Sequence, residues 1–135
     1  MSVTAAPDPG HGPVFIVDAD GALRRALQFA LGIDGYRVET WADAESFLAA
    51  PGEGGVQACL VVDYHLPGMN GIELIERLEA RGAAMPAILI VTNPSPGLAR
   101  RAAAAGIALV EKPLLGTALL DQIRDALAQG GNPSS

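Results

Sequence analysis

Five side chains able to do chemistry each stand at the end of a short apolar run in this sequence. They are Asp18, Asp20, Asp63, Thr92 and Lys112. Two neighbouring carboxylates repel each other unless a cation lies between them, and Mg²⁺ prefers oxygen ligands at a wet edge. A carboxylate can also attack phosphorus and form an aspartyl phosphate, which requires charge neutralisation on the three equatorial phosphoryl oxygens. The set therefore fits phosphoryl transfer, with Mg²⁺, Lys112 and Thr92 each serving one of those oxygens.

Alternating strands and helices are expected to hold these residues, because short apolar runs alternate with segments of helical periodicity. The expected strands are residues 14–17, 36–40, 59–62, 87–91 and 107–111. The expected helices are residues 22–33, 44–50, 72–81, 98–105 and 116–128. Several strands are continuously apolar, which is typical of parallel strands that helices cover on both faces. The sequence therefore predicts an α/β fold, a three-layer, doubly wound, five-stranded parallel sheet.

Such a sheet would bring the candidate residues together. The carboxyl ends of parallel strands meet at one edge, and ligands bind in the crevice there. With the strand order 2-1-3-4-5, the first and third strands are neighbours about 4.8 Å apart. Asp18 and Asp63 then come within reach of a single metal ion, with Thr92 and Lys112 at the same edge.

The composition favours one domain, expected over residues 14–129, with disordered segments at 1–13 and 130–135. The net charge of −6 argues against nucleic-acid binding by this domain. No apolar run approaches the ~20 residues of a membrane span. The single cysteine, Cys59, fits a reducing cytoplasm and is expected to be a buried strand residue. Residues after 129 leave no room for a DNA-binding helix-turn-helix, so a stand-alone protein and a fragment of a longer regulator both stay open.

Four segments occur in an order and spacing that is specific: VFIVD at 14–18, VVDYHLPGMNG at 61–71, IVT at 90–92 and EKP at 111–113. Together they resemble the receiver domains of bacterial two-component systems, which have the flavodoxin-like fold of CheY. The similarity covers about residues 14–129 and is strongest to receivers of the nitrogen-fixation regulator type. It implies a cis peptide bond between Lys112 and Pro113.

The resemblance implies a role for each matched residue. Asp63 is the phosphoacceptor, Asp18 is one acid of the metal-binding pair, and His65 gives Mg²⁺ its backbone carbonyl. Thr92 is the switch hydroxyl, and Lys112 pairs with the phosphoryl group. The implied donor is a histidine kinase or a phosphotransfer protein, and the implied output is a change of protein–protein contacts. The chain would then assist only its own phosphorylation and would not be an enzyme in the wider sense.

Two positions depart from the family pattern. The metal-binding start is normally two adjacent acids, but the second is Ala19 here, and a lost ligand should weaken metal binding by at least roughly 10–100-fold. Asp20 is the expected partial substitute, directly or through water. The switch aromatic normally lies three residues before the lysine, where this chain has Leu109. These departures favour an alternative, a pseudo-receiver that binds proteins with weak or no phosphorylation.

Four further alternatives stay open. Asp18 is also a candidate N-cap of the next helix. Thr92 could also be the last residue of a strand without a role in the site. The stretch Asp18-Ala19-Asp20-Gly21 resembles the opening of haloacid-dehalogenase-type phosphatases, with Asp18 as nucleophile and Asp20 as acid/base, although no acidic pair follows a late strand. Leucines 114 and 115 either pack onto the domain or form a partner or homodimer surface.

Overall fold

The computed structural model describes residues 13–50, 58–114 and 117–130. Its strands are β1 (Pro13–Val17), β2 (Arg37–Trp41), β3 (Cys59–Asp63), β4 (Ala87–Val91) and β5 (Ala108–Glu111). Its helices are α1 (Gly21–Ile33), α2 (Ala44–Ala49), α3 (Gly71–Ala80), α4 (Pro96–Ala104) and α5 (Ala118–Gly130). The expected alternation of strands and helices is confirmed, with ends that differ by one or two residues.

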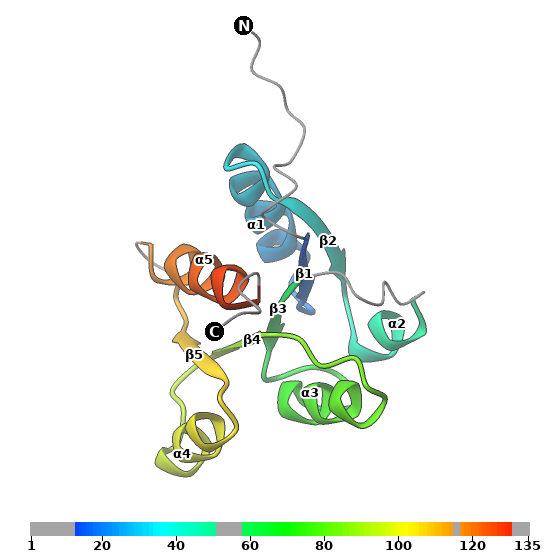
Figure 1. Cartoon of the computed structure of the whole chain (residues 1–135), viewed down its shortest axis with the longest axis vertical. Helices are drawn as coiled ribbons and strands as arrows, with labels where there is room; N and C mark the ends of the chain where they lie inside the picture. The colour runs from blue at the N-terminus through cyan, green and yellow to red at the C-terminus, as the bar shows by residue number, and fades with distance from the viewer. Residues whose placement is uncertain (1–12, 51–57, 115–116, 131–135) are drawn as a thin grey trace, which may run out of the picture.

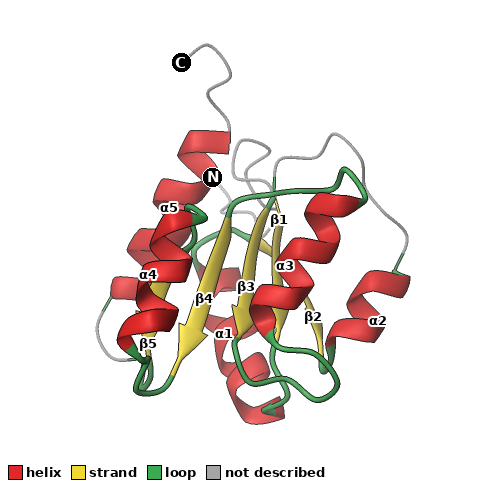
Figure 2. Cartoon of the chain, turned by 90° about the horizontal axis from the view of Figure 1, so that it is seen from below, coloured by secondary structure: helices red, strands yellow, loops and turns green. Residues whose placement is uncertain are grey.

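The five strands form one parallel sheet in the order β2-β1-β3-β4-β5, as the sequence predicts. Helices α1 and α5 cover one face, and α2, α3 and α4 cover the other (Figure 1). All strands therefore end at the same edge of the sheet (Figure 2). The result is a three-layer, doubly wound α/β fold of the CheY type.

Two apolar clusters lie on the two faces of the sheet, because successive strand residues point to opposite sides. The cluster under α2, α3 and α4 contains Phe15, Val17, Leu60, Val62 and Leu89. The cluster under α1 and α5 contains Val14, Ile16, Val61, Ile88 and Ile90. Burial on both faces is the physical reason why these strands are continuously apolar in sequence. Cys59 is fully buried in the second cluster, as expected, and burial raises the pKa of its thiol to about 12.

Some boundaries differ from the predicted ones. Pro13 belongs to β1 and Gly130 to α5, so the expected disordered segments are each too long by a residue, and their remaining residues lie outside the described ones. Helix α4 begins two residues earlier than expected, because Ser95 accepts a hydrogen bond from the Leu98 N–H and Pro96 takes the first turn. No helix among the described residues is long and apolar enough to span a membrane.

Candidate functional site

Asp18 and Asp63 are the only charged side chains that are buried among the described residues. In the sheet, Val17 of β1 pairs with Val62 of β3, so each aspartate stands one residue beyond a paired position on neighbouring strands. Buried carboxylates are rare unless they are paired or bind a cation. Their burial side by side marks this edge as the candidate site.

The carboxylate of Asp63 is held on both of its oxygens. Its Oδ1 accepts the backbone N–H of His65 at 2.9 Å, and its Oδ2 accepts the ammonium of Lys112 at 2.9 Å. Lys112 follows β5, and its backbone N–H donates to the carbonyl of Val91 at 2.8 Å, which fixes it beside β4. The expected convergence of the third and fifth strands on one charge pair is therefore observed.

Three groups of Asp18 are hydrogen-bonded, and one of its carboxylate oxygens is not. Its N–H donates to Trp41 O at 3.1 Å, its carbonyl accepts Arg24 Nη1 at 2.6 Å, and its Oδ1 accepts the Asp20 N–H at 2.9 Å. Its Oδ2 is buried and has no hydrogen-bond partner in the described part of the chain. The nearest cation is Lys112 Nζ at 3.6 Å, an ion-pair distance beyond a hydrogen bond.

The electrostatics follow from this packing. Burial, followed by the nearby charge of Asp63, raises the pKa of Asp18 above its usual value, although the Asp20 N–H and Lys112 act against the rise. Burial lowers the pKa of Lys112, but the hydrogen bond to Asp63 and the charges of both aspartates together raise it. Lys112 is therefore an ammonium ion that neutralises part of the negative charge of two carboxylates.

Asp20 has a structural role that was not expected from the sequence. Its Oδ1 accepts the N–H groups of Ala22 and Leu23 at 3.0 and 3.3 Å, so Asp20 is the N-cap of α1. The alternative that Asp18 caps this helix is wrong. With its Oδ1 bound to the helix N-terminus, Asp20 contributes at most its other oxygen to a cation or to acid/base chemistry.

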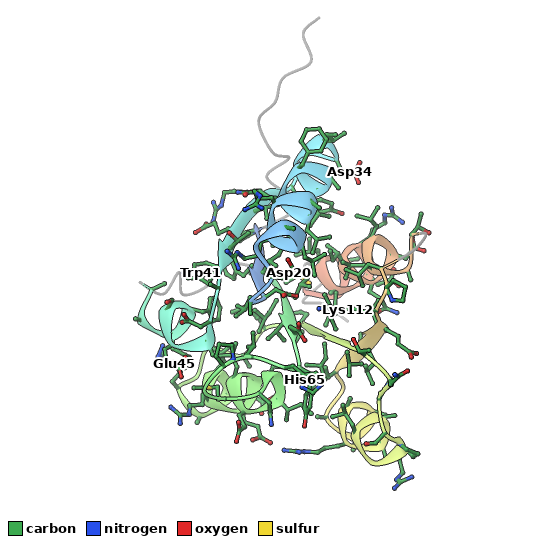
Figure 3. The ribbon with its side chains drawn as sticks, turned by 180° about the vertical axis from the view of Figure 1, so that it is seen from behind. Asp20, Asp34, Trp41, Glu45, His65 and Lys112 are labelled. Carbon is green, nitrogen blue, oxygen red and sulfur yellow. The ribbon has the colours of Figure 1, made fainter. Side chains whose placement is uncertain are left out.

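Two more of the expected site residues, His65 and Thr92, lie near the Asp63–Lys112 charge pair. His65 and Lys112 lie with Asp20 in the central part of the molecule (Figure 3), and the His65 ring packs edge-on against the Tyr64 ring with centroids 4.9 Å apart. Thr92 is exposed and stands two residues beyond Ile90, the strand partner of Asp63. Its side chain has no hydrogen bond in the described residues, so the geometry leaves its hydroxyl open.

The two departures from the family pattern are visible in the site. Ala19 is exposed between Asp18 and Asp20 and offers no oxygen to the site apart from its backbone carbonyl. Leu109 is half-buried against the cluster beneath α4. Leu114 is half-buried and packs onto the cluster beneath α5, whereas residue 115 lies outside the described ones.

Gly71 is needed at the end of the loop between β3 and α3. A Cβ at this position would lie 2.7 Å from the Asp63 carbonyl oxygen and 2.7 Å from Leu89 Cδ1, closer than real Cβ atoms approach. The Gly71 N–H also donates to Tyr64 O at 2.9 Å. The close approach of α3 to β3 thus fixes the loop between residues 63 and 71. The Lys112–Pro113 peptide bond is cis, as expected.

The residues present fit a bound Mg²⁺. Asp18 Oδ2 is a buried anionic oxygen without a hydrogen-bond partner, and Asp63 lies on the neighbouring strand. Within the described ranges, no three His, Cys, Asp or Glu side chains group to hold a metal. Mg²⁺ commonly takes only one or two carboxylates and keeps several waters. Asp18, Asp63 and the His65 carbonyl are the groups that would hold it here.

Arg24 is a site residue that the sequence reasoning missed. It lies on α1, and its guanidinium reaches back to the Asp18 carbonyl across six residues. A basic residue one turn into a helix carries no spacing signal for such a contact. The only hint in the sequence was an arginine in the first turn of a helix that has no acid there.

Comparison with known proteins agrees with the geometry. The response regulator receiver domain family matches residues 14–124. The transcriptional regulatory protein FixJ of Azorhizobium caulinodans is 36% identical over 122 residues, which cover 90% of this chain and 57% of that protein. The structure of the response regulator StyR superposes with a TM-score of 0.82 at 35% identity and covers 91% of this chain and 63% of that one. The structure titled FixJ-N superposes with a TM-score of 0.75 at 32% identity, over 87% and 94% of the two chains.

The chain spans little more than half the length of its FixJ relatives, 57% of the protein from Azorhizobium caulinodans and 58% of that from Bradyrhizobium diazoefficiens. The family match nevertheless covers most of the chain and includes both buried aspartates and Lys112. The chain therefore belongs to the response regulator receiver domain family of two-component systems.

Proposed function

We propose that this receiver domain accepts a phosphoryl group on Asp63 from a histidine kinase or phosphotransfer protein in the cytoplasm and then changes its protein–protein contacts. The single observation that carries the proposal is the 2.9 Å contact between Lys112 Nζ and Asp63 Oδ2, with an unpartnered Asp18 oxygen beside it. A nucleophile, an ammonium and a ligand for a cation are thereby present at one edge of the sheet.

The proposed step joins a carboxylate oxygen of Asp63 to phosphorus. The P–N bond of a phosphohistidine donor, or the P–O bond of acetyl phosphate, breaks, and its electron pair stays with the donor. Lys112 already contacts Asp63 and is placed to pair with the incoming phosphoryl oxygens. Mg²⁺, when bound, would neutralise further negative charge on those oxygens. Asp18, Asp63 and the His65 carbonyl would hold it.

The proposed readout begins at Thr92. Its exposed hydroxyl has no hydrogen-bond partner among the described residues, so it is available to a phosphoryl oxygen on the adjacent strand. A ligand shifts a conformational equilibrium only by its differential affinity for the two states, and this new hydrogen bond would supply that difference. Leu109 replaces the usual aromatic residue, so the motion that follows would be a repacking of an aliphatic side chain beneath α4.

The test is incorporation of phosphate from acetyl phosphate, measured by intact-protein mass. We expect one phosphoryl group per chain with Mg²⁺, none with EDTA, and none in Asp63→Asn. Asp121→Asn is the matched control, because Asp121 is an exposed aspartate on α5 that pairs with Arg124. Labelling that does not depend on Mg²⁺, or that persists in Asp63→Asn, would contradict the proposal.

A second candidate function is that of a pseudo-receiver, which uses the fold for protein binding without efficient phosphorylation. The observation that favours it is Ala19, which leaves the site with one carboxylate fewer than the family pattern. Lys112 also lies close to both remaining carboxylates, so the site is already partly neutralised without a metal. No labelling under conditions that fully modify an ordinary receiver would favour this function over the first.

A further inference from the structure

The start of α1 has an unusual charge pattern. Helix N-termini favour acidic side chains, because the helix dipole is positive there. Helix α1 has an acid at its N-cap, Asp20, but none in its first turn, where Arg24 lies, and Arg25 follows at the start of the second turn. Both guanidinium groups lie over the same spot, since a Cβ at Gly21 would meet Arg24 Nη2 at 3.3 Å and Arg25 Nη1 at 3.4 Å. Asp20 supplies the negative charge that the helix start favours, so the two arginines are not needed for the helix itself.

The two arginines differ in what they contact. Arg24 is half-buried, and its Nη1 donates to the Asp18 carbonyl at 2.6 Å. Arg25 is exposed, and no contact of its side chain with Asp18 is present in the described structure. A hydrogen bond with a charged donor is stronger than a neutral one and orients its acceptor more firmly. The Asp18–Ala19 peptide is therefore held from the helix side by Arg24 alone.

This contact completes the support of Asp18. The N–H of Asp18 is bound to Trp41 O, its carbonyl to Arg24, and its Oδ1 to the Asp20 N–H. With these groups fixed, Oδ2 is left buried and unpartnered, with Lys112 Nζ at 3.6 Å. The direction of Oδ2 is thus set by the backbone of residues 18–20. Of the two adjacent positions that carry acids in the family pattern, only residue 18 is an acid here, because residue 19 is alanine.

We infer that Arg24 is a positioning residue for the cation site: by binding the Asp18 carbonyl, it holds the Asp18 carboxylate ready for Mg²⁺. The inference rests on the proposed function in one respect, namely that Asp18 binds the cation. Preorganisation of Asp18 matters more here than in a site with two adjacent acids, because Asp18 has no acidic neighbour at residue 19 to share the binding of the cation with it and Asp63. Outer partners of metal ligands typically change metal affinity by roughly 10–100-fold.

A positioning role of Arg24 and a purely electrostatic effect of its charge predict opposite changes in Mg²⁺ affinity when Arg24 is replaced. Removing a positive charge near a cation site should strengthen Mg²⁺ binding, because repulsion falls. Removing the support of a ligand should weaken it. Arg24→Met keeps the apolar part of the side chain but loses both charge and donor, and Arg25→Met makes the same change one residue away. Arg24→Lys retains a charged donor on a shorter reach.

The experiment measures two quantities on the whole chain and its three variants. One is the Mg²⁺ dissociation constant by calorimetry, and the other is amide hydrogen exchange at Asp20 without metal, because that N–H donates to Asp18 Oδ1. We expect Mg²⁺ binding about tenfold weaker in Arg24→Met, partly restored in Arg24→Lys, and equal or tighter in Arg25→Met. Exchange at Asp20 should accelerate in Arg24→Met only.

The outcomes separate the inference from the function on which it rests. If wild type binds Mg²⁺ and Arg24→Met binds it equally well or more tightly, Arg24 acts only as a charge and the inference is overturned. If wild type binds no Mg²⁺, the cation part of the proposed function fails, and the claim that Arg24 serves a cation fails with it. Exchange at Asp20 that is unchanged in Arg24→Met would overturn the claim that Arg24 holds the Asp18 turn.

Discussion

Replacing Lys112 with methionine tests the charge arrangement of the site. The change removes the ammonium that lies 2.9 Å from Asp63 and 3.6 Å from Asp18 but keeps most of the side-chain volume. Two opposite charges about 3 Å apart attract by about 5 kcal/mol at an effective dielectric constant of about 20. The desolvation of the ammonium offsets part of this attraction. Loss of one partner of a buried ion pair costs about 3–5 kcal/mol.

The expected loss is smaller than for a fully buried pair. The side chain of Lys112 is 27% exposed, so water screens part of the interaction. We therefore expect the free energy of unfolding to fall by about 2–3 kcal/mol in the absence of metal. For a chain of this size, that loss corresponds to a melting temperature lower by roughly 10 °C. Arg124→Met is the control, since it removes the same charge from an exposed pair with Asp121 and should change little.

The response of the melting temperature to Mg²⁺ tests the charge arrangement most directly. With Lys112 gone, the uncompensated charges of Asp18 and Asp63 should attract the cation more strongly, so saturating Mg²⁺ should raise the melting temperature of Lys112→Met more than that of wild type. The assay is thermal unfolding by circular dichroism with and without Mg²⁺. Equal Mg²⁺ shifts in the two proteins would refute the reasoning, because the ammonium and the cation would then act at separate places.

The pH dependence has a definite sign. The pKa of Lys112 is raised by its partners, so the stability that the pair contributes is present below the ordinary lysine pKa and is lost as the pH rises through the raised value. The pKa of Asp18 is also raised, so ionisation of this group costs stability as the pH rises above its usual 3.8. The destabilisation in Lys112→Met should therefore shrink in acid, when the carboxylates are protonated.

Four further substitutions have expected outcomes. Asp18→Asn should stabilise the metal-free chain by on the order of 1 kcal/mol, because it removes a buried charge whose Oδ2 accepts no hydrogen bond, and should abolish the Mg²⁺-induced rise in melting temperature. Ala19→Asp restores the missing acid and should tighten Mg²⁺ binding in calorimetry by about tenfold or more. Gly71→Ala places a Cβ 2.7 Å from the Asp63 carbonyl oxygen and should cost about 2 kcal/mol in urea unfolding. Gly32→Ala, which meets nothing within 4 Å in α1, should instead gain about 0.5 kcal/mol.

A different result for any of these substitutions would contradict the account. A persistent Mg²⁺ shift in Asp18→Asn would place the cation elsewhere. Unchanged Mg²⁺ affinity in Ala19→Asp would mean that residue 19 does not face the cation. Equal stability of the two glycine variants would mean that helix α3 has room to move away from β3.

The strands could be predicted closely because their signal is physical and local. A run such as 87–91 is apolar throughout since both of its faces are buried, and the predicted and observed strands coincide. Helix α4 was placed less well, because Pro94 and Pro96 suggested a loop up to residue 97. Proline is tolerated in the first turn of a helix, and Ser95 caps it.

The candidate site was predictable where topology alone determines it. Once the strand order is fixed, residues that follow β3 and β5 must share an edge, and the Asp63–Lys112 contact confirms this. The N-cap role of Asp20 was not predicted, because an aspartate just before a helix can serve either the helix N-terminus or a cation, and the sequence does not decide between them. Arg24 was missed because its contact depends on how one long side chain folds back, which no periodicity encodes.

Trapping of the acyl phosphate tests the central claim most directly. The chain is treated with acetyl phosphate and Mg²⁺ and then with borohydride, which reduces an aspartyl phosphate to homoserine, and the peptides are mapped by mass spectrometry. The account predicts homoserine at position 63 and at no other aspartate. Homoserine at position 18, or no conversion in a folded chain that binds Mg²⁺, would contradict it.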